Sequence, residues 1–249
     1  MDEPRLYLHR LVIRDPLGLQ RRARELRLPD QPYDPDFVLH SLLNEVAGPR
    51  YLGPFVQDPR SRGGAVLAYS RLSREALHEQ AQMVAPPEIY SLVDWEATQA
   101  KPLPTSWPAG RCLGFRVRVS PIVRGPKGHG QGDVEVRKRR PEVDAYLAQC
   151  WQQEKAPDRE AVYRIWLERE LARDGAAEAV EMQMTGFRLK RAMRRDAARK
   201  AKAITRPDAL FKGTLRVADA EAFKGLLARG VGRHRGFGFG MLLLTAEGG

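Results

Sequence analysis

The sequence has little cysteine and no long hydrophobic run. Its 249 residues include two cysteines, Cys112 and Cys150, which stand too far apart in the chain to form a metal-binding motif. We interpret both as packing thiols in a reducing compartment, which excludes a disulfide-built fold. No apolar run approaches the roughly 18 residues of a membrane span, and residues 1–5 lack the apolar core of a signal peptide. These absences predict a soluble, cytoplasmic protein that does not bind membranes.

Motifs for common cofactors are also missing. The chain has no HExxH pattern and no cluster of cysteine and histidine with the spacing of a metal site. It also lacks a P-loop, the glycine and lysine motif that cradles nucleotide phosphates. The sequence therefore predicts no metal and no small-molecule cofactor, and it argues against the enzyme classes that depend on these motifs.

Positive charge, by contrast, is abundant and unevenly placed. The chain has 42 lysines and arginines against 31 acids, a net charge of +11, which is typical of nucleic-acid-binding proteins. Between residues 186 and 206, one acid, Asp196, stands among nine basic residues: Arg188, Lys190, Arg191, Arg194, Arg195, Arg199, Lys200, Lys202 and Arg206. A basic helix on a membrane surface needs a broad apolar face, which this segment lacks. Nucleic acid is the predicted partner.

A glycine-rich loop covers residues 230–240. Five glycines are spaced along it, and Arg233, His234 and Arg235 carry its basic or titratable side chains. Because glycine has no Cβ and accepts positive φ, successive backbone amides can converge there on one anion. The alternative is a flexible turn before the last strand. We predict a phosphate-binding loop with these contact residues: Gly230, Gly232, Arg233, His234, Arg235, Gly236 and Gly238.

The first half of the chain predicts alternating strands and helices. Strands are expected at residues 6–13, 50–57, 64–72, 89–95 and 111–123, helices at 35–47 and 73–84, and a loop or short helix at 20–32. The first of these helices has Asp34 as N-cap, Pro35 at its first position and Gly48 at its end. The order β-α-β-β-α-β is that of a ferredoxin-like domain, predicted here for residues 1–124.

The second half predicts a similar domain at residues 125–249. Strands are expected at 134–139, 180–189, 210–217 and 237–245, and helices at 141–153, 158–174 and 219–228. We predict an α+β fold of two tandem ferredoxin-like (RRM-like) domains, the second carrying an arginine-rich helical insertion at 188–206. The basic block is also compatible with a projecting hairpin, and the whole chain is compatible with one α+β domain that carries a long insertion.

Three segments together resemble a known family. Residues 211–219 and 230–244 look like the C-terminal signature of the CRISPR RNA-processing endoribonucleases, in particular the CasE subgroup of Cascade systems. Residues 112–121 resemble an internal strand of that subgroup, with Ser120 in place of the usual asparagine. His40 falls where the family carries its catalytic histidine.

The resemblance implies metal-independent cleavage of CRISPR repeat hairpins. In that reaction the 2′-hydroxyl attacks the adjacent phosphorus and expels the 5′-oxygen, which leaves a 2′,3′-cyclic phosphate. It further implies that the protein stays bound to the hairpin of the mature guide RNA, beside the backbone subunits of an effector complex. Two features depart from the subgroup. Phe37 replaces a usual tyrosine, for which Tyr33 is the nearest substitute, and the arginine-rich block resembles that of type IV CRISPR systems.

Candidate site residues follow from these patterns. His40 lies outside the apolar stripe of its helix and is the predicted general base or acid, with Asn44 placed at i+4 to orient it and Tyr33 as a weaker catalytic candidate. His234 is a second-choice catalyst. A track for an RNA stem is predicted from Arg116, Arg118, Arg137, Lys138, Arg139 and Arg140, together with Arg188, Lys190, Arg191, Arg194, Arg195, Arg199 and Lys200.

Two other functions stay open at this point. The protein could be a non-catalytic subunit that binds the hairpin, because the phenylalanine at Phe37 can neither donate nor accept a proton. It could also be a general nucleic-acid-binding protein unrelated to CRISPR, which would fit the charge but leave the C-terminal signature unexplained.

Overall fold

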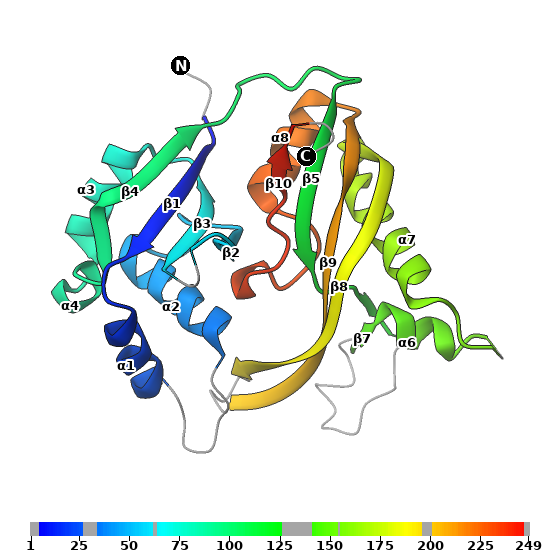
Figure 1. The fold of residues 1–249 in the computed structure, drawn as a ribbon, viewed down its shortest axis with the longest axis horizontal. Helices are drawn as coiled ribbons and strands as arrows, with labels where there is room; N and C mark the ends of the chain where they lie inside the picture. Colours follow the sequence, from blue (N-terminus) through cyan, green and yellow to red (C-terminus); the bar gives the residue numbers. More distant parts are fainter. Residues whose placement is uncertain are drawn as a thin grey trace.

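The computed structural model of the chain describes residues 5–26, 34–61, 64–125, 141–153, 155–195 and 201–246. Within these residues the chain forms two four-stranded antiparallel sheets, which stand side by side in Figure 1. A segment at the top of that view carries the chain from one sheet to the other. The mixture of helices with two antiparallel sheets agrees with the predicted α+β class.

The first sheet is built from the first 102 residues and has the strand order β2-β3-β1-β4. Its elements are β1 (Tyr7–Ile13), α1 (Pro16–Leu26), α2 (Pro35–Ala47), β2 (Phe55–Gln57), β3 (Ala65–Ser70), α3 (Arg74–Val84), α4 (Pro87–Tyr90) and β4 (Val93–Pro102). This strand order is the ferredoxin-like arrangement that the sequence predicts. Several boundaries differ. The strand expected at 50–57 begins only at Phe55, α4 occupies the start of the strand expected at 89–95, and β4 continues to Pro102. Helix α1 begins at Pro16, before the loop or short helix expected at 20–32.

Helix α2 follows from its own residues. Asp34 caps it by accepting a hydrogen bond from the Asp36 backbone N–H at 3.2 Å, Pro35 takes the first helical position, and Gly48 ends it with a φ of 91°. The apolar stripe is buried against the first sheet and consists of Val38, Leu39, Leu42, Leu43 and Val46. That burial fixes the rotation of the helix and turns His40 away from the core of the first sheet.

The second sheet has the order β10-β5-β9-β8. Its half of the chain contains β5 (Cys112–Val119), β6 (Ile122–Arg124), β7 (Glu142–Asp144), α6 (Ala145–Cys150), α7 (Arg159–Leu171), η1 (Arg173–Gly175), β8 (Ala177–Arg195), β9 (Ala201–Val217), α8 (Ala220–Arg229), η2 (Arg235–Phe237) and β10 (Leu243–Thr245). Strand β5 pairs with β9 and β10, so its expected place in the first domain is wrong. The strand expected at 134–139 lies outside the described residues.

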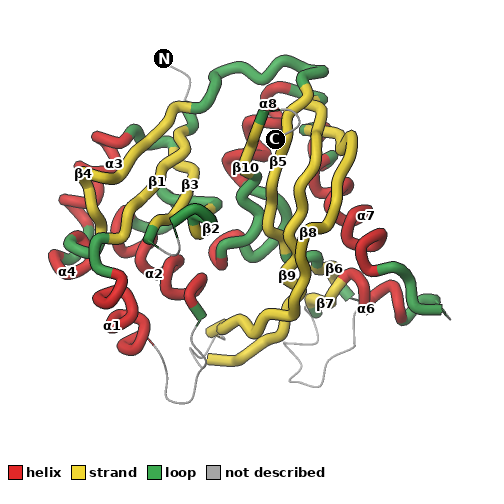
Figure 2. Tube along the Cα trace, viewed as in Figure 1, coloured by secondary structure: helices red, strands yellow, loops and turns green. Residues whose placement is uncertain are grey.

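The arginine-rich block is not helical where the structure describes it. Strands β8 and β9 continue through it as one long antiparallel hairpin, with Lys190 opposite Arg206 and Arg195 opposite Ala201. Figure 2 shows strand on both arms, and the far end of the hairpin curves toward the start of α2. The expected helical insertion is therefore corrected to an extension of the sheet. An isolated basic helix would have no packing partner, whereas each arm here pairs with the other along its length.

Helix α8 and the segment after it lie between the two sheets (Figure 1). Leu226, Leu227 and Leu242 belong to one buried cluster with Tyr69 of β3, whose hydroxyl donates to the backbone oxygen of Leu242 at 2.8 Å. The first sheet is thus covered on both faces, by α2 on one face and by the C-terminal half of the chain on the other. In the described part of the chain, no helix is long and apolar enough to cross a membrane.

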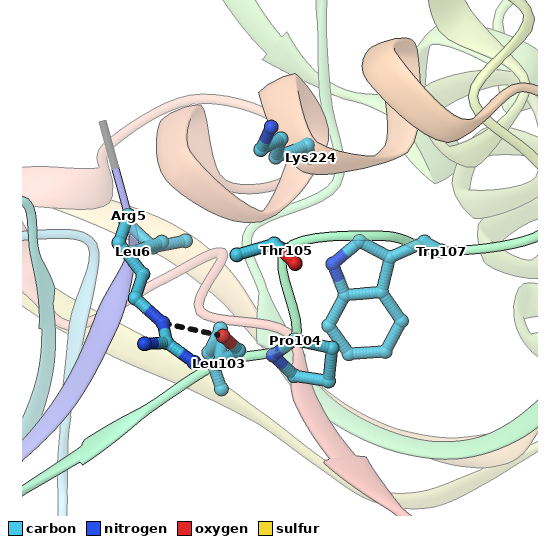
Figure 3. A pocket seen from close by; sticks show the side chains of 7 residues that line it. All are labelled: Arg5, Leu6, Leu103, Pro104, Thr105, Trp107 and Lys224. Atoms are coloured by element: carbon cyan, nitrogen blue, oxygen red, sulfur yellow. Dashed lines mark hydrogen bonds between the residues drawn. The ribbon is translucent and has the colours of Figure 1, made fainter. Parts of the chain in front are cut away.

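The connection between the sheets is packed against the body of the protein. Trp107 is buried and meets Phe223 of α8 edge-on, with ring centroids 5.4 Å apart. Figure 3 shows a small pocket at this junction, lined by Arg5, Leu6, Leu103, Pro104, Thr105, Trp107 and Lys224. Arg5 donates to the Leu103 backbone oxygen there at 3.5 Å. These contacts tie the two halves together at the end opposite the hairpin tip.

Candidate functional site

His40 lies where the two halves of the molecule meet. Phe55 of β2 is stacked on its ring, with centroids 6.4 Å apart and planes 10° apart. Phe237 of η2 lies 5.8 Å away at 37°. The amide nitrogen of Asn44 is 3.1 Å from Nε2 and 3.5 Å from Nδ1 of His40, so Asn44 lies within hydrogen-bond distance of the ring, in the orienting position that the sequence predicts.

Burial of the imidazole lowers the pKa of His40 below its ordinary value of 6.5. The ring is therefore neutral at pH 7, which is the state in which it can accept a proton. Neither helical periodicity nor the resemblance predicts this shift, because it depends on how far other parts of the fold bury the ring.

A network of charged side chains surrounds Asp36, which lies one helical turn before His40 on α2. Arg118 of β5 donates to Asp36 Oδ2 at 2.9 Å and to both carboxylate oxygens of Asp208 on β9 at 2.7 and 2.8 Å. Lys190 of β8 donates to Asp34 Oδ1 at 2.8 Å and to Asp36. The start of helix α2 is thus joined directly to β5 and β8 of the second sheet, and through Arg118 to β9.

Most of this network is shielded from water. The side chains of Arg118 and Lys190 are 13% and 12% exposed, and that of Asp36 is 6% exposed. Arg188, by contrast, is 70% exposed although it donates to Asp208 Oδ2 at 2.8 Å. Two of the predicted RNA-binding cations are therefore engaged with carboxylates inside the protein, while most of the Arg188 side chain is open to solvent.

The glycine-rich loop folds back on itself and onto this network. Val231 N–H donates to the Gly240 backbone oxygen at 2.8 Å, and Gly240 N–H donates to the Arg118 backbone oxygen at 2.7 Å. Gly238 has a φ of 73° and lies against Asp36 and Arg118, where a Cβ would come within 3.1 Å of the Asp36 carboxylate. The glycines of the loop thus allow close packing within the protein.

Glu142 of β7 holds the charged part of the loop. It accepts hydrogen bonds from Arg233 at 3.1 Å, from His234 at 3.0 Å and from Arg206 of β9 at 3.0 Å. Burial alone would raise the pKa of Glu142, but His234 and the two guanidinium groups outweigh it and lower the pKa to about 2. The carboxylate is therefore charged at neutral pH and fixes the loop against the base of the hairpin.

The structure brings together only some of the predicted site residues. His40 lies beside Gly236 of the loop with Asn44 at its ring, and Arg118 and Lys190 are one helical turn away, around Asp36. Arg116 is exposed on β5, and Arg235 donates to the backbone oxygen of Arg229. The backbones of Arg191, Arg194 and Arg195 belong to β8. Several other predicted residues lie outside the described residues: Tyr33, Arg137, Lys138, Arg139, Arg140, Arg199 and Lys200.

Sequence reasoning missed the carboxylates and aromatic rings of this region. Asp36, Asp208 and Glu142 each pair with cations that were assigned to RNA, and Phe55 and Phe237 flank His40. The sequence signal for Asp208 is a single acid placed two residues after the basic block of residues 188–206. Within the described residues, no group of three or more histidine, cysteine, aspartate and glutamate side chains could hold a metal ion.

Comparisons with known proteins agree with this fold. A family model described as CRISPR associated protein matches residues 6–246. A search of curated protein sequences found no match.

Solved structures of similar fold were also found. The CRISPR endoribonuclease Cse3 bound to a 19-nucleotide RNA is 21% identical to this chain with a TM-score of 0.62, covering 97% of this chain and 99% of that one. The CRISPR-associated protein Cas6e from Escherichia coli K-12 is 21% identical with a TM-score of 0.58 over 96% and 99%. A chain of a CRISPR RNA-guided surveillance complex is 17% identical with a TM-score of 0.50 over 96% and 99%.

Proposed function

Because the chain belongs to the family of CRISPR-associated proteins, we propose that it is an endoribonuclease that cleaves CRISPR repeat hairpins without a metal ion. The observation that carries this proposal is a neutral histidine enclosed by both halves of the fold, one helical turn from a cluster of cations. A solved structure of similar fold is named as a CRISPR endoribonuclease bound to RNA, which supports the same activity here.

The reaction needs a base, a proton for the leaving oxygen and positive charge near the phosphorus. We propose that His40 takes the proton of the 2′-hydroxyl as that oxygen attacks the adjacent phosphorus. The bond from phosphorus to the 5′-oxygen then breaks and the leaving oxygen takes up a proton from water, which gives a 2′,3′-cyclic phosphate and a 5′-hydroxyl, while His40 returns its proton to the solvent. The lowered pKa of His40 favours the base role over the acid role, because the ring is unprotonated at neutral pH.

The cations around Asp36 supply the charge. Arg118 and Lys190 both reach Asp36, at the same face of α2 as His40 and one turn before it. A phosphate held beside His40 would lie close to these two groups. Asp34, Asp36 and Asp208 offset part of their charge, and the charge that remains stabilises the negative charge that develops in the transition state. Arg116 and Arg188 are exposed on the same sheet and are proposed to bind the stem of the hairpin.

The proposed setting is a cytoplasmic effector complex in which the protein stays on the hairpin of the mature guide RNA. The fold it shares with a chain of a surveillance complex supports this setting. A non-catalytic hairpin-binding subunit is the second candidate, because Phe37 stands where the resemblance implies a tyrosine.

One incubation separates these functions. The purified protein is mixed with an end-labelled hairpin RNA copied from a CRISPR repeat of its own genome, in buffer that contains EDTA. A single cut that leaves a 2′,3′-cyclic phosphate is the expected result. Tight binding without a cut would instead support the non-catalytic subunit, and equal affinity for the hairpin and an unstructured RNA of the same length would contradict both. A copy of the RNA with a 2′-deoxy sugar at the cut position is the control and should remain intact.

A further inference from the structure

The imidazole of His40 is held by parts of the chain nearly 200 residues apart in sequence. Helix α2 carries the histidine, β2 supplies Phe55, and the glycine-rich loop supplies Gly236 and Phe237. The loop was expected to cradle phosphate, but this part of it lies against the side chain that is proposed to do the chemistry.

We propose that Gly236 and Phe237 are positioning residues for His40, and that seating of the glycine-rich loop on α2 completes the catalytic site. This inference rests on the proposed function for its effect on rate, but not for its effect on the histidine itself. Neither residue touches the reacting atoms in this account, since both act through the imidazole ring.

Gly236 has no room for a side chain. A Cβ added there would lie 2.9 Å from Cε1, 3.2 Å from Nδ1 and 3.4 Å from Nε2 of His40. Carbon atoms in contact normally stand about 3.5–4.0 Å apart, so an alanine would push the imidazole out of its place. Glycine at position 236 therefore allows the loop backbone to pack directly against the His40 ring.

Phe237 closes the site from the loop. Its ring lies 5.8 Å from His40 and 6.2 Å from His234, within the range of aromatic contacts. Together with Phe55 it encloses the imidazole in apolar surface, which disfavours the protonated form. Removal of either ring would let water reach His40.

The loop is braced on both sides of this contact. Nε2 of His234, just before η2, lies within hydrogen-bond distance of Glu142 and of Arg206, and Gly240, three residues after η2, donates to the backbone oxygen of Arg118. Because these contacts fix the backbone on both sides of η2, the loop cannot easily move away from α2 to make room for a larger side chain at position 236. The strain of a substitution there should fall on the His40 ring.

The charged groups near His40 do not explain its lowered pKa, because each is paired with another group. On α2, Asp36 is paired with Arg118 and Lys190. On the loop, His234 is engaged by Glu142, and Arg235 donates to the backbone oxygen of Arg229. Phe55 of β2 is uncharged. Enclosure by aromatic rings is therefore the feature to vary.

The test compares Gly236→Ala and Phe237→Leu with Gly225→Ala as the matched control. Gly225 lies in α8, where an added Cβ would meet no atom within 4 Å. The His40 C2–H signal is assigned from its loss in His40→Ala and titrated by NMR. In parallel, cleavage of the repeat hairpin is followed in single turnover from pH 5 to 9. Circular dichroism establishes that each variant is folded.

In both loop variants we expect the pKa of His40 to rise toward 6.5 and the acid limb of the rate profile to move to higher pH by the same amount. The plateau rate should fall about 10- to 100-fold, as expected for a misplaced catalytic group, with RNA affinity within about threefold of wild type. An unchanged His40 titration in both folded variants would overturn the proposal, and so would a shifted titration with unchanged cleavage. If the wild type does not cleave at all but the titration shifts, the proposed function fails while the loop still positions the ring.

Discussion

At the scale of single residues, Arg116 and Arg118 show how far neighbouring side chains can differ. They are two positions apart on β5 and therefore on the same face of the strand. Arg116 is exposed, while Arg118 lies between Asp36 and Asp208 with its guanidinium 4.6 Å above the ring of Phe239. Sequence alone assigned both to RNA. The structure gives Arg118 a second task, which is to neutralise two buried carboxylates.

Replacement of each arginine by methionine should separate the two tasks. Arg118→Met leaves the carboxylates of Asp36 and Asp208 short of a counter-charge in a buried setting, and should lower the free energy of unfolding by about 3 kcal/mol. Arg116→Met should change it by no more than about 0.5 kcal/mol, because the side chain is exposed, but should weaken hairpin binding. Urea unfolding and RNA titration of both variants measure these effects. Equal stability of the two proteins would contradict the role given to Arg118.

At the scale of elements, local signals predicted helices well and sheet membership poorly. Helix α2 is correct to within a residue because its cap at Asp34, its proline and its closing Gly48 all act within the helix. Strand β5 was placed in the wrong domain, since its pattern of alternating residues says nothing about which strand it pairs with. For the same reason the arginine-rich block could not be decided between a helical insertion and a projecting hairpin. It is a hairpin because its two arms pair with each other, and no local pattern in the sequence shows that pairing.

The candidate site also contains residues that local sequence signals predict and residues that only the tertiary packing brings in. His40 and Asn44 were predicted because they share a helix face at a spacing of four residues. Phe55, Phe237 and Glu142 could not be predicted, because they reach the site only through the packing of α2 against the loop and of the loop against β7.

A further element-scale prediction concerns the bond between the loop and β7. With a pKa of about 2, the Glu142 carboxylate contributes stability above its unfolded pKa of about 4.3, and that contribution is lost as pH falls toward 2. Glu142→Gln removes the charge at every pH. We therefore expect wild type to have a higher Tm than the variant at pH 7, and the difference to shrink between pH 4 and pH 2. A difference that stays constant over this range would show that the charge of Glu142 does not hold the loop.

At the scale of the whole molecule, the two ferredoxin-like halves depend on each other. Helix α8 and the segment after it cover the second face of the first sheet, and the hairpin of the second sheet binds the start of α2. His40 belongs to the first half, but its neighbours Gly236 and Phe237 belong to the second. The site therefore exists only in the assembled chain, and changes at the junction of the halves should affect activity.

The most direct test of this account is single-turnover cleavage of the repeat hairpin by His40→Ala beside wild type, with RNA affinity measured in the same buffer. The variant removes the proposed base but keeps Arg116, Arg118, Arg188 and Lys190. We expect its cleavage rate to fall at least about 100-fold, within the range of general base catalysis, and its Kd for the hairpin to stay within about threefold of wild type. Cleavage by His40→Ala at the wild-type rate would contradict the assignment of His40 as the general base.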